Sequence, residues 1–192
     1  AAGGPMALTV AEGSVWTVGN ESGSVYRLNA DGTTEETPTP AAGAFGIAVT
    51  DADLWVVSRT GGEVWRVPRD GGEPESFATG ENPKGVAVAA GSVFVANATS
   101  GTVTVLDEGS GEEVTTARVG GVPRDVVEFD GRIWVSNGGN GGDGWVDVLD
   151  PTEPGSSQRV RVEGSPEGLG TGGGRVWVTT GKAGNSAVAI RP

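Results

Sequence analysis

Residues 83–107 read PKGVAVAAGSVFVANATSGTVTVLD, and this stretch decides the fold of the chain. It holds three runs rich in Val and Thr, which are separated by the short segments Ala90-Gly91 and Thr99-Ser100-Gly101. Val and Thr favour strands, and glycine-containing segments between such runs favour tight turns. The apolar spacing typical of an amphipathic helix is not found here. The stretch therefore predicts consecutive strands joined by tight turns.

The same pattern returns along the whole chain. Its anchor is a turn residue followed by an apolar residue and an aromatic one, at Ser14-Val15-Trp16, Asp53-Leu54-Trp55, Ser92-Val93-Phe94, Arg132-Ile133-Trp134 and Arg175-Val176-Trp177. The successive aromatic residues are separated by 39, 39, 40 and 43 positions. A period of this length indicates a repeat architecture in which each repeat is one small structural unit.

Each repeat holds three or four strand-like runs, enough for one small sheet. The second run is almost continuously apolar, as in Trp55-Val56-Val57, which is typical of a strand covered on both faces. The fourth run is polar, as at Thr33 to Thr39, which indicates an exposed outer strand. We therefore predict sheets stacked face to face, with the repeated aromatic residue buried between neighbouring sheets.

With these repeats the chain resembles the β-propellers of the YVTN/NHL (virginiamycin B lyase-like) superfamily over essentially its whole length. The resemblance implies an all-β fold, a β-propeller of five four-stranded antiparallel blades within a single domain of residues 1–192. The expected repeats span residues 5–43, 44–81, 82–121, 122–164 and 165–192. Because the fifth repeat stops after its third strand-like run, we expect the last blade to lack its outer strand.

The chain departs from that superfamily in its number of blades, because members of the superfamily usually have more than five. The way in which the ring closes is therefore open. Three arrangements remain: a closed five-bladed ring, a fragment of a longer propeller, or a ring completed by another chain. We expect the closed monomer, because an uncovered strand edge invites aggregation. An edge-paired oligomer is the alternative.

The composition excludes several classes of function. The chain has no His and no Cys, which excludes disulfides, thiolate metal sites, cysteine nucleophiles and Ser-His-Asp triads. The formal net charge is −12, which opposes binding to nucleic acids and to anionic membrane surfaces. No run approaches the roughly 18 apolar residues of a membrane span. We therefore expect neither a nucleic-acid partner nor membrane insertion by this chain.

Candidate binding residues lie just before the innermost strand of each repeat. In the propellers that the chain resembles, ligands and partners bind on the face where loops enter these strands, around the axial channel. The repeat alignment puts one residue of each repeat at that point: Met6, Phe45, Lys84, Arg124 and Glu167. Proline precedes all but Phe45 and fixes the backbone direction there. This set predicts a binding site at the axial face; solvated loop tips and channel fillers are the alternative reading.

A second column of residues follows the central strand of each repeat. It consists of Gly19, Ser58, Asn97, Asn137 and Thr180, with Arg59 next along the chain in the second repeat. Asn and Ser most simply cap turns through hydrogen bonds to the backbone. We nevertheless include Arg59, Asn97 and Asn137 in the predicted site, because the two columns are expected to converge at one end of the ring.

The resemblance implies a non-catalytic binding or recognition domain. Similar propellers serve as extracytoplasmic sensor domains of bacterial receptor Ser/Thr kinases and as secreted or periplasmic binding proteins. We therefore expect a location outside the cytoplasm, a protein or small-molecule partner at the axial face, and no cofactor.

Two other functions remain open. One is an enzyme resembling the streptogramin lyases, although those use His and a divalent metal, and this chain has no His. A lactonase-type calcium site would instead draw on Glu167, Asn97 and Asn137. Residues 138–143 also match a G-G-x-G-x-D calcium repeat once, but a single copy favours a long hairpin. The other function is a structural one, as part of a larger assembled propeller.

Overall fold

The computed structural model describes residues 4–138, 144–181 and 186–191. All regular secondary structure in these ranges is β-strand. The described part of the chain has no helix that is long and apolar enough to cross a membrane. Apart from Gly138, the match to a calcium repeat lies outside the described residues.

The strands form five antiparallel sheets, in which each strand pairs with the next one in sequence. The first two sheets contain β1 (Pro5–Ala11), β2 (Ser14–Gly19), β3 (Val25–Leu28) and β4 (Thr34–Thr37), then β5 (Ala44–Val49), β6 (Asp53–Ser58), β7 (Glu63–Pro68) and β8 (Glu75–Ala78). The next two contain β9 (Pro83–Ala89), β10 (Ser92–Asn97), β11 (Thr102–Asp107) and β12 (Glu113–Arg118), then β13 (Val122–Phe129), β14 (Arg132–Gly138), β15 (Gly144–Asp150) and β16 (Glu153–Val162). The last contains β17 (Ser165–Gly172), β18 (Arg175–Gly181) and β19 (Ser186–Ile190).

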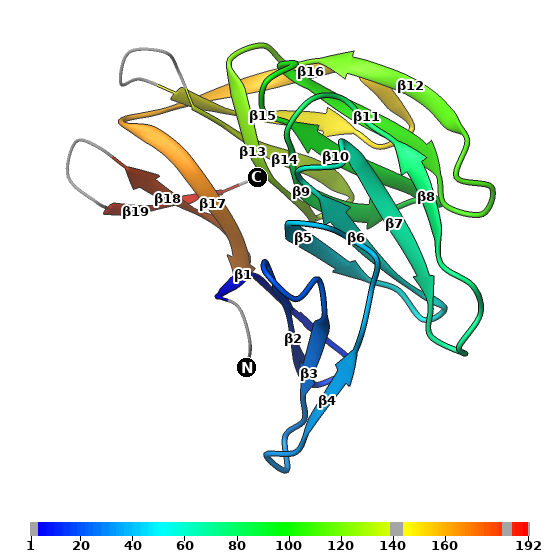
Figure 1. Cartoon of the computed structure of the whole chain (residues 1–192). Helices are drawn as coiled ribbons and strands as arrows, with labels where there is room; N and C mark the ends of the chain where they lie inside the picture. The colour runs from blue at the N-terminus through cyan, green and yellow to red at the C-terminus, as the bar shows by residue number, and fades with distance from the viewer. Residues whose placement is uncertain (1–3, 139–143, 182–185, 192) are drawn as a thin grey trace.

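The five sheets are the blades of a β-propeller, as the repeats predict (Figure 1). The first strand of each blade is the innermost, so that β5 packs between β1 and β9, and β13 packs between β9 and β17. Four blades have four strands and the last has three in the described residues, which confirms the predicted loss of its outer strand.

The core consists of apolar layers between consecutive blades, and each layer contains one of the repeated aromatic residues of the first four blades. Trp16 packs with Leu54 of the next blade, and Phe94 packs with Ile133. The aromatic side chains of the first four blades, Trp16, Trp55, Phe94 and Trp134, are at most 4% exposed. Their predicted burial between sheets is therefore confirmed.

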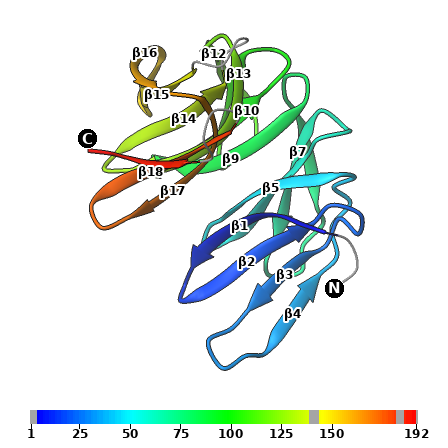
Figure 2. The same cartoon turned by 90° about the vertical axis from the view of Figure 1, so that its left-hand side faces the viewer.

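The ring is open between the last blade and the first. In the described residues β17 and β1 do not pack together as the other neighbouring innermost strands do. Trp177 of the last blade is consequently 44% exposed, and Leu8 and Val10 of β1 are each 68% exposed. Figure 2 shows these two blades apart from each other. The expected closed ring is thus wrong, as is the expected burial of Trp177, because no following blade covers that side chain.

Two glycines allow the innermost strands to approach each other closely around the axis. A Cβ atom at Gly85 would lie 2.7 Å from both Asp125 Cα and Val126 N on the next blade. A Cβ atom at Gly46 would overlap the carbonyl oxygen of Lys84. Glycine inside a strand is expected where another backbone comes this near. The close approach positions Phe45 and Lys84, which precede the two glycines, next to each other.

Candidate functional site

A channel of about 650 Å³ runs along the propeller axis, and all five innermost strands line it. The five residues predicted from the first column, Met6, Phe45, Lys84, Arg124 and Glu167, all line this channel. They begin or nearly begin their strands, so they gather at one end of it. The opposite end is lined by residues farther along the same strands, including Val10, Val49 and Glu128.

The Phe45 ring is approached by two cations. The Arg59 guanidinium carbon lies 5.6 Å from the ring centroid, and Lys84 Nζ lies 5.5 Å from it. Each such cation–π contact is worth about 0.5–2 kcal/mol, depending on how far water is excluded. Arg59, from the second predicted column, is therefore brought to the same place as Phe45 and Lys84.

Arg124 and Glu167 form an ion pair between the fourth and fifth blades. Arg124 Nη1 lies 2.9 Å from Glu167 Oε2, and the two side chains are 29% and 42% exposed. A pair this accessible to water contributes only about 0–1 kcal/mol to stability. Arg124 Nε is buried and has no hydrogen-bond partner among the described residues. The pair therefore neutralises charge at the channel mouth without using all the donors of Arg124.

The cations at this end of the channel act on one another. Burial lowers the pKa of the Lys84 ammonium, and repulsion by Arg124 and Arg59 lowers it further. Glu167 acts in the opposite direction and only partly offsets these effects. Like charges in a partly desolvated place disfavour ionisation of each other. The channel end therefore holds three cations, of which only Arg124 forms an ion pair among the described residues.

Asn97 and Asn137 lie away from this cluster, inside their blades. Both are fully buried. Asn97 Nδ2 donates to Thr104 Oγ1 at 2.9 Å, and Asn137 Nδ2 donates to the Gly120 carbonyl at 2.8 Å. Asn97 thus bonds hydroxyl groups of β11 and Asn137 bonds the segment that leads into β13, so neither amide caps the turn after its own strand as the turn-capping alternative expects. The structure thus does not bring the two amides together with Glu167, as a lactonase-type calcium site would require.

Asp125 is a channel residue that the sequence analysis missed. Its Oδ1 accepts a hydrogen bond from Val126 N at 2.9 Å and its Oδ2 accepts one from Leu169 N at 2.8 Å, which joins the fourth blade to the fifth. The residue is partly accessible, but its carboxylate is enclosed. Burial raises the pKa of this carboxyl to about 6, although the two backbone hydrogen bonds favour the charged form.

A signal for Asp125 was present in the repeats. The residue after each member of the predicted ring is Gly46, Gly85 or Gly168 in three of the other blades, and Ala7 in the first. A carboxylate in a column of the smallest residues is an exception that an alignment of the repeats can reveal.

We expect Asp125→Asn to flatten the dependence of stability on pH. Because the folded-state pKa is raised, Asp125 favours folding most below pH ~4, and this contribution is lost as pH rises through about 6. The loss is at most ~3 kcal/mol for the wild-type chain. Urea unfolding measured between pH 4 and pH 7.5 checks this, with the exposed turn residue Asp130→Asn as the control. An Asp125→Asn profile parallel to that of the wild type would contradict the assignment.

No group of three or more acidic residues able to hold a metal ion occurs in residues 4–138, 144–181 and 186–191. The acidic residues that line the channel are Asp125, Glu128 and Glu167. Asp125 accepts backbone hydrogen bonds, Glu128 accepts one from Gly131 N, and Glu167 pairs with Arg124. The chemistry that this arrangement offers is recognition of charge and of an apolar surface.

Comparisons with solved structures confirm the β-propeller fold. The virginiamycin B lyase of Staphylococcus aureus is similar with a TM-score of 0.73 at 15% identity, over 98% of this chain and 70% of that one. A chain of the nidogen/laminin complex gives 0.77 at 15% identity, over 97% and 75% of the two chains. BamB from Moraxella catarrhalis gives 0.67 at 16% identity, over 96% and 55%.

At these identities the similarity is one of fold. The fold that the resemblance to the YVTN/NHL propellers implies is thereby confirmed. The similar structures include an enzyme, the lyase, and a propeller in a complex between two proteins. A comparison with protein-family models finds no match, and a comparison with curated protein sequences finds none.

Proposed function

We propose that this chain is a non-catalytic binding domain whose ligand or protein partner binds at the cationic end of the axial channel. The observation that carries this proposal is the convergence of side chains from all five blades on one channel of about 650 Å³. These side chains combine an aromatic ring, an apolar thioether and charges of both signs. Concave sites with a few polar groups on an apolar wall are the usual ligand sites of proteins.

The role we propose for this binding is sensing outside the cytoplasm. Its support is the resemblance of the repeats to the sensor propellers of bacterial receptor kinases. The similar chain in the nidogen/laminin complex supports a protein partner as one form of ligand. A propeller that presents side chains from packed strands at its axis suits recognition, because little ordering is needed on binding.

A fragment screen tests the binding function directly. Neutral, cationic and anionic fragments are screened by ligand-observed NMR against the wild type, Phe45→Ala and Tyr26→Ala. We expect fragments that bind the wild type and Tyr26→Ala but not Phe45→Ala, since Phe45 lines the channel and Tyr26 lies on β3 of the first blade. Fragments that bind all three proteins equally, or no fragment at all, would contradict a site in the channel.

A metal-dependent enzyme is the alternative that the lyase similarity favours. A thermal melt with calcium and with EDTA, run beside the fragment screen, distinguishes a metal-dependent enzyme from a non-catalytic binding domain. We expect the same Tm in both, because the acidic channel residues already have protein partners. A shift of several degrees would favour the enzyme.

A role as part of an assembled propeller is favoured by the exposed faces at Leu8 and Trp177. Its test is whether the wild-type chain has a mass above 19.2 kDa by light scattering and Trp177→Ala a lower one.

A further inference from the structure

The charges at the cationic end of the channel are not balanced by the described protein. Arg59, Lys84 and Arg124 act on one another there. Arg124 pairs with Glu167, whereas Arg59 and Lys84 make no ion pair within residues 4–138, 144–181 and 186–191; their contacts are to the Phe45 ring. Asp125, the other acidic residue near this end, accepts hydrogen bonds from Val126 N and Leu169 N and forms no ion pair with these cations among the described residues. The site therefore has more cations than carboxylates that pair with them.

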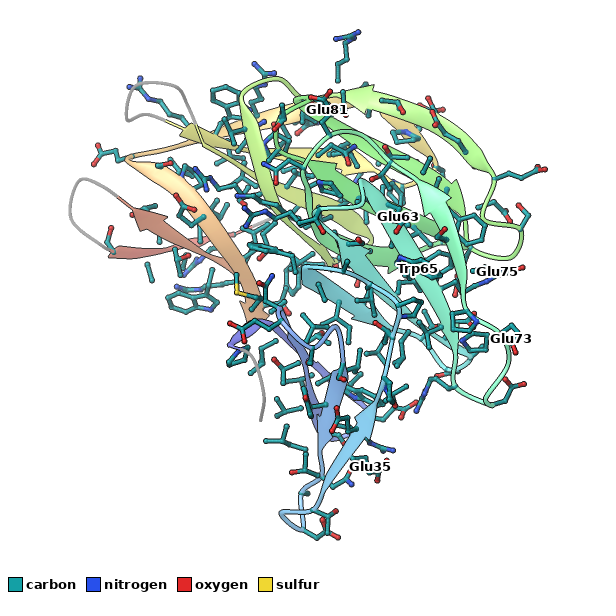
Figure 3. The ribbon with its side chains drawn as sticks, in the orientation of Figure 1. Glu35, Glu63, Trp65, Glu73, Glu75 and Glu81 are labelled. Carbon is teal, nitrogen blue, oxygen red and sulfur yellow. The ribbon has the colours of Figure 1, made fainter. Side chains whose placement is uncertain are left out.

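The position of these cations is unusual in a chain with a net charge of −12. Glutamates such as Glu35 on β4 and Glu75 on β8 lie on the outer strands, at the rim of the molecule (Figure 3). Another, Glu63 on β7, accepts a hydrogen bond from Trp65 Nε1 at 2.8 Å (Figure 3). Glu35 pairs with Arg27 and Glu75 pairs with Arg66, so none of these three carboxylates pairs with Arg59 or Lys84.

An apolar wall adjoins the cations. Phe45 and Met6 line the same end of the channel, and Leu8 of β1, which is 68% exposed, lines it farther along. A ligand that fits both features has a negatively charged group at one end and an apolar body beside it. Arg and Lys bind carboxylates and phosphates through charge-assisted hydrogen bonds.

We propose that the axial channel binds a small organic anion, whose carboxylate or phosphate lies among Arg59, Lys84 and Arg124 and whose apolar body lies against Phe45 and Leu8. This inference rests on the proposed binding function and adds the class of ligand to it. The anion supplies the counter-charge that Glu167 alone does not provide.

The test uses five probes that differ in one feature at a time: benzoate, phenyl phosphate, benzamide, benzamidine and acetate. Each is titrated into the wild-type chain and followed by NMR shifts. We expect benzoate or phenyl phosphate to bind at least about tenfold more tightly than benzamide and benzamidine. Benzoate and phenyl phosphate carry an anionic group, whereas benzamide is neutral and benzamidine is a cation. Acetate is expected to bind more weakly than benzoate, since it lacks the apolar body. The tighter of the two anions identifies the head group.

Variants then locate the site. Lys84→Met and Arg59→Met are each expected to weaken binding of the better anion about tenfold. Arg118→Met, on the exposed outer strand β12, is the matched control and is expected to have no effect. Glu167→Gln is expected to strengthen binding several-fold, because it releases Arg124 from its ion pair. A gain from one variant and a loss from two others cannot be produced by unfolding.

The outcomes separate this inference from the proposed function. If benzamide or benzamidine binds in a Phe45-dependent way as tightly as benzoate, the channel is a binding site but not one for anions, and the inference is wrong. If anions bind but Lys84→Met and Arg118→Met weaken them equally, the cationic cluster is not their site and the inference is also wrong. If no probe or fragment binds in the channel, both proposals fail.

Discussion

Replacing Trp55 with alanine is expected to lower the free energy of unfolding by about 3–5 kcal/mol. The Trp55 ring is fully buried between the second and third blades, where it packs with Val93 and Val95 and meets the Phe77 ring at a centroid distance of 5.9 Å. Truncation removes these contacts and leaves a cavity between two rigid sheets that cannot collapse to fill it. Urea unfolding, followed by far-UV circular dichroism, measures the change.

Trp177→Ala is the matched control for this prediction. Trp177 has the same place in the repeat but is 44% exposed, so its truncation is expected to cost about 1 kcal/mol or less. An equal cost for the two tryptophans would show that the Trp177 face is covered in solution, as in an assembled propeller. Light scattering would then give a mass above 19.2 kDa for the wild type and a lower mass for Trp177→Ala.

Gly85→Ala is expected to destabilise the chain by about 3 kcal/mol. The added Cβ would lie 2.7 Å from two backbone atoms of β13, and backbone cannot rotate away as a flexible side chain can. The innermost strands of the third and fourth blades would have to move apart. Lys84 and Arg124 precede the two contact points, so the same change is expected to weaken ligand binding in the channel. Urea unfolding and the benzoate or phenyl phosphate titration measure the two effects.

Gly170→Ala, on β17, is the control for Gly85→Ala. A Cβ at Gly170 meets nothing within 4 Å. Its effect is expected to be neutral or slightly stabilising, because alanine loses less conformational freedom than glycine on folding. If Gly85→Ala proved as harmless as Gly170→Ala, the close approach of the innermost strands would not be a constraint on the fold.

The repeated sequence was sufficient to predict the blades themselves. Strand alternation, turn glycines and the aromatic column are local features, and the five members of that column from Trp16 to Trp177 count the five blades directly. The ring of residues from Met6 to Glu167 also followed from the spacing, because equivalent positions in equivalent blades must lie at the same height on the axis.

The roles of individual polar residues did not follow from the spacing. Asn97 and Asn137 share a column with Ser58, next to Arg59, yet their amides turn into the blades while Arg59 lies over the Phe45 ring. The direction of a side chain at a strand end depends on the local bend of the chain and on the partners within reach. Asp125 was missed because its two hydrogen-bond donors, Val126 N and Leu169 N, belong to different blades.

The sequence by itself therefore determined the all-β propeller, its five repeats, its short last blade and the residues that face the axis. Only the tertiary structure decided that the ring is open between β17 and β1, that Trp177 is exposed, and that Arg124 is ion-paired at the channel end whereas Arg59 and Lys84 lie against the Phe45 ring. The physical reason is how far apart in the chain the residues that decide each feature lie. Strand pairing and burial within a blade depend on neighbours in sequence, whereas closure and electrostatics depend on small tilts between blades that add up around the axis.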